Sequence, residues 1–397
     1  MDNPWLTIIG IGEDGLSGLS EASRKALSRA EVVLGGARHL ALADVGGRGH
    51  PWPTPFDATC VLARRGRPTA VLASGDPFWH GVGSVLAERL NRSEWVAYPS
   101  ASTFSLAASR LAWPLESVTC LGLHAAPFER LLPHLANGTR IICLLRDGAA
   151  ANELAQWLTA RGWGSSQFWT LTALGGPREC ITRQQAASYA SDSDIRLIAV
   201  AIEACGSGGL SRSFGLSDEL FVHDGQITKR PMRALALSAL APKEGEQLWD
   251  IGAGSGSVAI EWALRGGLAI AVEASRDRAA NIRKNVESFG LTHRVTIIEG
   301  EAPGILSDLE PPQAVFIGGG FDAAMFDWLW PRLARKARLV VHAVTLETEA
   351  LLMGLHQSHA GELMRIEIAH AAPLGRYRSW EPTRPIVQWS LVKGGDE

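Results

Sequence analysis

A glycine-rich turn that directly follows a buried strand is the feature of this sequence that most constrains its fold. The predicted strand at residues 248–251 leads into Gly252, Gly254 and Gly256, and the helical pattern of residues 258–264 follows at once. In an α/β protein such a turn lets the backbone pass close beneath a ligand, which then lies at the amide-rich start of the helix. The pattern therefore predicts a strand, a ligand-binding turn and a helix in this order.

Two acidic elements extend this candidate site along the predicted sheet. Glu273 ends the next predicted strand, where a carboxylate can accept both hydroxyl groups of a ribose. Residues 299–302 follow the third strand at the same carboxyl edge, where the ligands of open α/β sheets collect. The glycine spacing is not that of dinucleotide-binding proteins, and no phosphate-binding Lys follows it. The pattern instead resembles that of methyltransferases that use S-adenosylmethionine (SAM).

Strand and helix patterns alternate along both halves of the chain, which indicates an α/β architecture throughout. The alternation lapses at residues 205–213, a Gly- and Ser-rich stretch typical of a linker. We therefore expect one domain over residues 1–207 and a second over residues 208–397. Further strands are predicted at residues 5–11, 31–36, 69–73, 139–144 and 196–200 of the first domain and at residues 268–272, 295–298, 314–317 and 339–344 of the second.

The last two predicted strands, residues 364–370 and 386–392, are joined without an insert long enough for a helix. A connection that short requires an antiparallel pair, because parallel strands need a longer crossover. The second domain is therefore expected to hold a mostly parallel, Rossmann-like sheet that is closed by an antiparallel hairpin.

The composition is that of an ordinary globular protein and excludes several classes. The 397 residues are 46% hydrophobic and 20% charged, and the net charge of -3 does not suit a nucleic-acid-binding protein. No uninterrupted apolar run is long enough to span a membrane. The five Cys are widely spaced, so they indicate neither a zinc site nor a disulfide framework, and no metal is expected. We expect a cytoplasmic protein.

Arg greatly outnumbers Lys in this chain: only six of the 38 basic residues are Lys. Codon bias is the simplest explanation. Selection for bidentate binding of carboxylates or phosphates is the alternative, because the guanidinium fork matches both groups.

Several stretches of the second domain resemble the decarboxylating precorrin methyltransferases of cobalamin biosynthesis. They are residues 223–230 (HDGQITKR), 248–262 (LWDIGAGSGSVAIEW), 314–320 (AVFIGGG) and 343–347 (AVTLE). In that family the Thr of the first stretch, the glycine loop and the acidic residue after the second strand contact SAM. The resemblance implies SAM contacts from Thr228, Gly252, Ala253, Gly254, Ser255, Gly256 and Glu273, with Ala302 beside the adenine.

Three stretches of the first domain resemble the tetrapyrrole methyltransferase superfamily, most closely the subgroup that acts on carbon 5 of a corrinoid precursor. They are residues 9–12 (IGIG), 35–40 (GGARHL) and 73–77 (ASGDP). In that superfamily SAM lies in a cleft between two α/β halves. The resemblance implies that Gly10, Gly12, Gly75, Asp76, Ser102 and Thr103 contact it here.

The two domains together resemble a family of fused enzymes of cobalamin (vitamin B12) biosynthesis. This resemblance implies that the first domain methylates carbon 5 of a precorrin. The second would methylate carbon 15 and remove the carbon 12 acetate carboxyl group as carbon dioxide, giving precorrin-8. It also implies a homo-oligomer.

Binding of this polycarboxylate substrate leads us to expect Arg side chains around the clefts. The candidates nearest the motifs are Arg212, Arg230, Arg233, Arg376, Arg378 and Arg384. For each of them the alternative interpretation is an ordinary surface residue exposed to solvent. His342 could donate to a substrate carboxylate or move a proton, although a structural histidine is the favoured interpretation. For Asp224, a role in the site and a role as a helix N-cap or turn residue are equally favoured.

Two other functions fit parts of the same sequence. One is an RNA or protein methyltransferase built on the second domain, against which the near-neutral charge argues where RNA is concerned. The other is a non-catalytic module that binds SAM or carries a tetrapyrrole. Such a module would bind its ligands without forming S-adenosylhomocysteine.

Overall fold

The computed structural model describes residues 4–190 and 196–394 and divides the chain into two compact units. The first unit comprises Met1–Phe128 and His134–Gly209, and the second comprises Glu129–Pro133 and Leu210–Glu397. The chain passes to the second unit two residues after the boundary expected from the Gly- and Ser-rich stretch. The mixed α/β architecture of both units confirms the predicted fold class.

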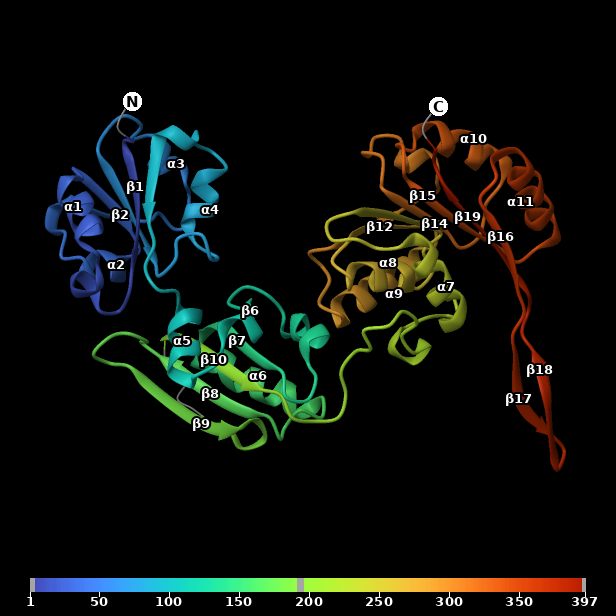
Figure 1. Ribbon diagram of the computed structural model, residues 1–397, viewed down its shortest axis with the longest axis horizontal. Helices are drawn as coiled ribbons and strands as arrows, with labels where there is room; N and C mark the ends of the chain where they lie inside the picture. Colours follow the sequence, from blue (N-terminus) through green and yellow to red (C-terminus); the bar gives the residue numbers. More distant parts are fainter. Residues whose placement is uncertain (1–3, 191–195, 395–397) are drawn as a thin grey trace. The chain divides into compact units, whose positions relative to one another are not determined.

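The first half of the first unit is a parallel sheet with strand order β3-β2-β4-β1-β5 (Figure 1). Ile8, Ile9, Val33 and Val71 are fully buried, because both faces of a parallel sheet are covered and its strands read as continuous apolar runs. The strands are β1 (Leu6–Ile11), β2 (Val32–Gly35), β3 (Gly49–Pro51), β4 (Thr69–Ser74) and β5 (Trp95–Tyr98), and the helices are α1 (Glu21–Arg29), α2 (Ala37–Leu42), α3 (Thr59–Leu62) and α4 (Val82–Ala87).

The second half of the first unit is a mixed sheet with strand order β6-β7-β10-β8-β9. Its first pair is parallel and the others are antiparallel. Helix α5 (Thr103–Leu111), which starts after β5, packs on this sheet through the buried Phe104 and Ala107. The other elements are β6 (Val118–Gly122), β7 (Arg140–Asp147), α6 (Gly148–Ala160), β8 (Gln167–Thr172), β9 (Cys180–Gln185) and β10 (Arg196–Glu203).

The second unit is built on a sheet with strand order β13-β12-β11-β14-β15-β19-β16. Strands β11 to β15 are parallel, and β19 lies antiparallel between β15 and β16. The strands are β11 (Gln247–Ile251), β12 (Leu268–Glu273), β13 (Val295–Glu299), β14 (Ala314–Ile317), β15 (Arg338–Ala343), β16 (Glu362–Ile366) and β19 (Ile386–Val392).

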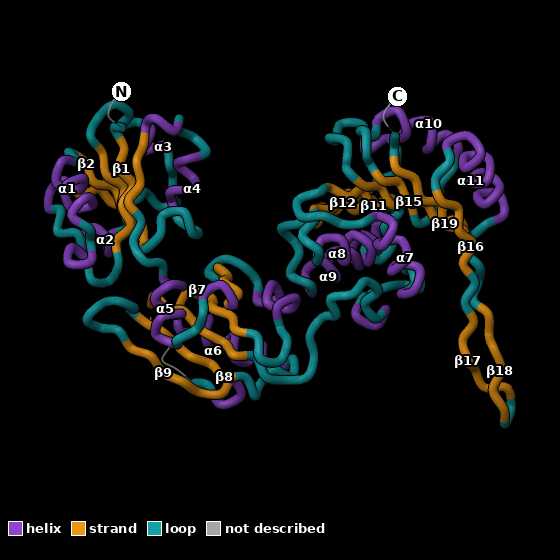
Figure 2. Tube along the Cα trace, in the orientation of Figure 1, coloured by secondary structure: helices purple, strands orange, loops and turns teal. Residues whose placement is uncertain are grey.

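Helices cover both faces of this sheet (Figure 2). One core contains side chains of α7 (Arg230–Leu240), α8 (Ser257–Ala263) and α9 (Arg276–Ser288). The other contains side chains of α10 (Ala323–Arg332) and α11 (Leu346–His359). Within the described residues, no helix combines the length and apolar character that a membrane span requires.

The predicted closing pair of strands is present, but its connection is more elaborate than predicted. Strands β16 and β19 pair antiparallel, with Glu362 opposite Ser390. The predicted strand at residues 364–370 is wrong as a single element, because β16 ends at Ile366 and a second strand begins at Ala369. Strands β17 (Ala369–Leu374) and β18 (Tyr377–Pro382) form a separate hairpin, which extends from the unit as an arm (Figure 1).

Candidate functional sites

The glycine turn of the second unit follows β11 and has the backbone shape that only glycine adopts without strain. Gly252, Gly254 and Gly256 have φ angles of 68°, 59° and 74°. The amides of Gly252 and Ala253 both donate to the Val272 carbonyl of the neighbouring strand. A Cβ atom on Gly254 would lie 2.9 Å from the backbone oxygen of Gln226. The turn is therefore held against β12 on one side and against the 224–228 segment on the other.

Glu273 joins the glycine turn to the ends of β12 and β13. Its carboxylate accepts the Gly254 amide at 2.8 Å and the Ser275 amide at 2.9 Å, and its own carbonyl accepts the Gly300 amide. The side chain is only 5% exposed. Because each carboxylate oxygen can accept a further hydrogen bond, Glu273 can still receive ligand hydroxyl groups. Ala302, half-buried, lies two residues beyond Gly300.

The 224–228 segment brings two more predicted residues to this edge. A Cβ on Gly318, after β14, would lie 3.7 Å from the Thr228 hydroxyl oxygen, which places Thr228 beside the Gly318–Gly320 turn. Asp224 accepts the Gln226 amide and pairs with Arg278 at 2.9 Å, and the hydrogen bond from this guanidinium lowers the pKa of Asp224. Its exposed side chain thus makes the contacts of a turn residue.

Two buried residues that hold this site together were not predicted. Asp250, at the end of β11, accepts the Ala259 amide of α8 at 3.0 Å, and burial raises the pKa of its carboxyl group to about 7. Asn285 of α9 donates to the carbonyls of Val222 and Ser255 and accepts the Val222 amide. Asp250 belongs to the glycine motif, whereas Asn285 carries no local signal because its partners are distant in sequence.

Arg233 does not occupy the position expected of a substrate-binding residue. Its side chain is fully buried, with its Nε 2.6 Å from a carboxylate oxygen of Glu261 and one Nη 3.0 Å from Asp218. It also donates to the carbonyls of Leu216 and Thr228. A guanidinium engaged in this way cannot turn toward a substrate, so Arg233 supports the segment that carries Thr228.

This placement predicts that Arg233→Met lowers stability rather than substrate affinity alone. Removing one partner of a buried ion pair leaves the other charge uncompensated, at a cost of about 3–5 kcal/mol. We expect the second unit's unfolding transition to shift to lower denaturant concentration by a matching amount. The control is Arg230→Met at an exposed position on the same helix, and equal transitions for the two variants would contradict this role.

His342 has the environment of a structural histidine. It is 3% exposed, and its Nε2 lies 2.9 Å from the side-chain oxygen of Gln388, its cross-strand neighbour. Its ring also packs edge-on against Phe316. Burial lowers the pKa of His342, which favours the neutral imidazole. These contacts support the structural interpretation over substrate binding.

The remaining Arg candidates are all exposed and lie in three different places. Arg212 follows the passage between the units, and Arg230 begins α7. The hairpin arm and the segment that follows it carry Arg376, Arg378 and Arg384. Among the described residues, none of the contacts of these side chains joins them to the glycine turn, so their role in substrate binding stays a prediction.

Three loops interlock at the carboxyl edge of the first unit's parallel sheet. A Cβ on Gly10 would lie 1.8 Å from the Gly75 oxygen, and the Ser100 hydroxyl donates to the Gly10 carbonyl at 2.7 Å. Gly75 has a φ of 56° and donates its amide to Ile11. Gly10 therefore serves the close packing of the loops after β1, β4 and β5.

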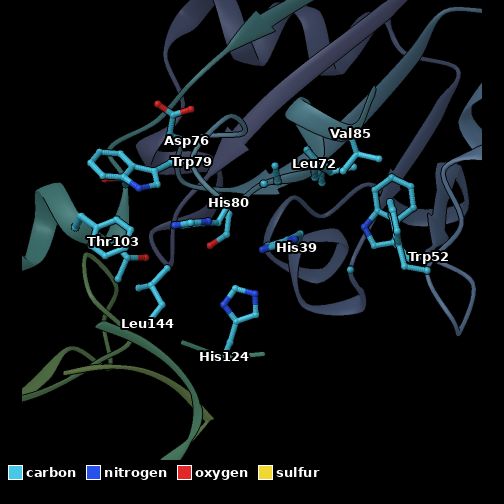
Figure 3. Close-up of a pocket in the computed structure, with 18 residues that line it drawn as sticks. His39, Trp52, Leu72, Asp76, Trp79, His80, Val85, Thr103, His124 and Leu144 are labelled. Carbon is cyan, nitrogen blue, oxygen red and sulfur yellow. The ribbon is translucent and has the colours of Figure 1, made fainter. Parts of the chain in front are cut away.

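Two cavities that share several lining residues lie beside these loops, and Figure 3 shows the larger of them. The smaller, about 190 Å³, is lined by Gly12 and Gly75 among others. The larger, about 560 Å³, is lined by Asp76, Ser102 and a set of aromatic and imidazole side chains. Thr103 lines both. Five of the six residues predicted for this unit thus line at least one of the two cavities. The aromatic and imidazole residues of the larger cavity are Trp52, Phe56, Trp79, Phe104, His39, His80 and His124.

A charged cluster at the smaller cavity was not predicted. Glu13 pairs with Arg38 and with Arg178, and Arg38 contacts the ring of His39. Burial, with a smaller contribution from Arg38, lowers the pKa of His39 to about 4. The GGARHL motif drew attention to Arg38 and His39, but their pairing with Glu13 depends on loops that only the fold brings together.

Both units have features that suit an adenosyl ligand. Glu273 retains acceptor capacity, and the Ser255 hydroxyl is buried in the glycine turn without a hydrogen-bond partner. In the first unit, glycine backbone borders the smaller cavity. Among the residues that the structure describes, no group of His, Cys, Asp or Glu side chains is arranged to hold a metal ion.

Comparisons with known proteins find a matching family for each of the two units. Residues 5–188 match the family described as tetrapyrrole (corrin/porphyrin) methylases, and residues 219–393 match the precorrin methyltransferase domain. Precorrin-6Y C(5,15)-methyltransferase [decarboxylating] of Sinorhizobium sp is 45% identical over 99% of this chain and 97% of its own.

Two shorter relatives match parts of the chain. Cobalt-precorrin-6B C(15)-methyltransferase (decarboxylating) of Salmonella typhimurium is 32% identical over 43% of this chain and 92% of its own. The crystal structure of the C-terminal domain of precorrin-6Y C5,15-methyltransferase from Rhodobacter capsulatus is 54% identical, covers 46% of this chain and 100% of its own, and superposes with a TM-score of 0.46.

Proposed function

Because this chain belongs to the family of decarboxylating precorrin-6Y C(5,15)-methyltransferases, we propose that it methylates a precorrin at carbons 5 and 15 and decarboxylates the acetate at carbon 12. The main observation behind this proposal is that one chain matches both a tetrapyrrole methylase domain and a precorrin methyltransferase domain. The predictions of an enzyme and of its family are confirmed by the full-length relative.

SAM supplies the methyl group at both sites in this proposal. In the second unit the ribose would lie against Glu273, with the glycine turn beneath it and Thr228 and Ala302 beside it. In the first unit the smaller cavity would hold SAM against Gly12, Gly75 and Thr103. Support comes from the open acceptor positions of Glu273 and from the glycine backbone that borders the cavity.

The protein's main contribution to methyl transfer is alignment. A meso carbon between pyrrole rings of a reduced tetrapyrrole is enamine-like, so it can attack a methyl group without a strong base. The unit must hold this carbon about 3–3.5 Å from the methyl group and in line with the departing sulfur. Attack at carbon 15 leaves iminium character on the ring, which can accept the electron pair released when the carbon 12 acetate loses carbon dioxide.

The division of labour follows the two units in this proposal. The unit with the interlocking loops methylates carbon 5, and the unit with the glycine turn methylates carbon 15 and decarboxylates. Support comes from the Salmonella relative, which is named a decarboxylating C(15)-methyltransferase and covers less than half of this chain. Its match with 92% of its own length indicates that such an enzyme can exist alone.

An assay of S-adenosylhomocysteine formation tests the proposal against its rivals. The purified chain is incubated with SAM and either a metal-free precorrin or bulk RNA. We expect turnover with the precorrin alone. Turnover with RNA alone would favour an RNA methyltransferase, and binding of both ligands without turnover would favour a carrier.

We also propose that the protein acts in the cytoplasm. Its cysteines are free, and the cytoplasm is the compartment that keeps thiols reduced.

We further propose that copies of the chain associate through the β17–β18 arm. An isolated two-stranded hairpin is marginally stable in water, yet this one exposes Leu374, Tyr377 and Trp380 by 65–73%. Replacing all three with Ser is expected to lower the sedimenting mass, because the apolar contact between copies is lost. The control is Met353→Ser on α11, and an unchanged mass in the triple variant would contradict the proposal.

A further inference from the structure

The two cavities of the first unit share a short border at which the transferred methyl group would have to pass. Ser74, Thr103, His124 and Leu144 line both cavities. His124 follows β6, is exposed to the cavity space, and lies near His39 and His80 in Figure 3. Of the four shared side chains, only the imidazole is a common proton acceptor in enzymes at neutral pH.

The contents of the two cavities follow from their linings. The smaller one is bordered by the glycine loops, whose backbone suits the cofactor. The larger one carries Trp52, Phe56 and Trp79, whose flat rings suit a tetrapyrrole, and it is large enough for a substantial part of one. The reacting carbon would therefore meet the methyl group beside His124.

Methylation at carbon 5 releases a proton, and this proton needs an acceptor. Carbon 5 forms a bond with the methyl carbon while the carbon–sulfur bond breaks and its electron pair leaves with the sulfur. The ring then carries one positive charge. Breaking the bond between carbon 5 and its hydrogen returns an electron pair to the ring and sets free one proton.

We propose that His124 is the catalytic base that accepts this proton through an imidazole nitrogen. The inference rests on the proposed carbon 5 methylation and adds to it a residue that the sequence did not indicate. The other ionisable groups of the larger cavity are less suitably placed. His39, His80 and Asp76 line that cavity without lining the smaller one, and Asp76 already accepts the Phe78 amide.

The test compares the full-length wild-type chain with His124→Ala in carbon 5 methylation of a precorrin. We expect kcat to fall by about 100-fold or more, the range typical of a lost general base, with SAM and precorrin dissociation constants within about twofold of wild type. Added imidazole should raise the rate of the variant at least about tenfold, because it can occupy the space of the deleted ring. The matched control is His50→Ala, an exposed histidine of β3 that lines neither cavity.

Deuterium at carbon 5 provides a readout that a structural role would not move. In His124→Ala, loss of the proton should limit the rate, so the deuterated precorrin should react at least about twofold more slowly than the protonated one. A wild-type rate, or a slow rate with neither imidazole rescue nor an isotope effect, would overturn the role of His124 alone. Absence of carbon 5 methylation in the wild-type chain would overturn the proposed function together with this inference.

Discussion

Gly254→Arg is expected to abolish methylation at carbon 15, with a loss of at least about 100-fold, the effect of displacing reacting groups by about 1 Å. Gly254 has a φ of 59°, which an Arg adopts only with strain, and its Cβ would lie 2.9 Å from the Gln226 oxygen. The substitution would also displace the amide that Glu273 accepts. The glycine turn and the Glu273 carboxylate would then no longer be positioned to bind the same SAM molecule.

Carbon 5 methylation by the same variant is expected to be unchanged, since it belongs to the first unit. The measurement is methyl incorporation at each carbon, determined by nuclear magnetic resonance of the product. Gly354→Arg on α11 is the matched control, because a Cβ at that position meets nothing within 4 Å. Normal carbon 15 methylation by Gly254→Arg would count against the glycine turn as the site.

Separating the two domains is expected to separate methylation at carbon 5 completely from methylation at carbon 15 and decarboxylation. Residues 1–207 alone should methylate carbon 5 and leave the acetate in place, and residues 208–397 alone should methylate carbon 15 and release carbon dioxide. The physical reason is that each unit has its own core and its own candidate site. Residues Glu129–Pro133 cluster with the second unit but remain on the first fragment, so the full chain is the reference for both rates.

Carbon dioxide release and methyl incorporation are measured for each fragment with the same precorrin preparation. An equimolar mixture of the fragments is the control, and it should form the product of the full chain. If the second fragment forms a methylated product that keeps the acetate, the assignment of decarboxylation to it fails. If the first fragment releases carbon dioxide, the proposed division of labour is wrong.

Much of the fold could be predicted because its signals are local. The buried parallel strands read as continuous apolar runs, and the glycine turn after β11 marks where strand gives way to helix. The β17–β18 arm could not be predicted in the same way. Residues 364–368 alternate apolar and charged side chains past the end of β16 at Ile366, so the alternation does not mark where that strand ends. The arm is exposed, so no burial pattern distinguishes it.

The sites were predictable to the extent that their residues lie in contiguous motifs. Glu273 contacts the glycine turn, as expected for a residue at the end of the neighbouring strand, and Thr228 lies beside the Gly318–Gly320 turn. The role of Arg233 depends on Glu261 and Asp218, distant residues that determine its burial. His124 likewise gains its position from the packing of two sheets, and a lone His after a strand gives no such signal. Long-range contacts are what the sequence pattern lacks.

The most decisive experiment is the mass spectrum of the product that the wild-type chain forms from a metal-free precorrin with SAM. We expect a product that has gained two methyl groups and lost one carbon dioxide. A product with a single methyl gain, or with two methyl gains and all of its carboxyl groups, would contradict the claim that one chain carries out both methylations and the decarboxylation.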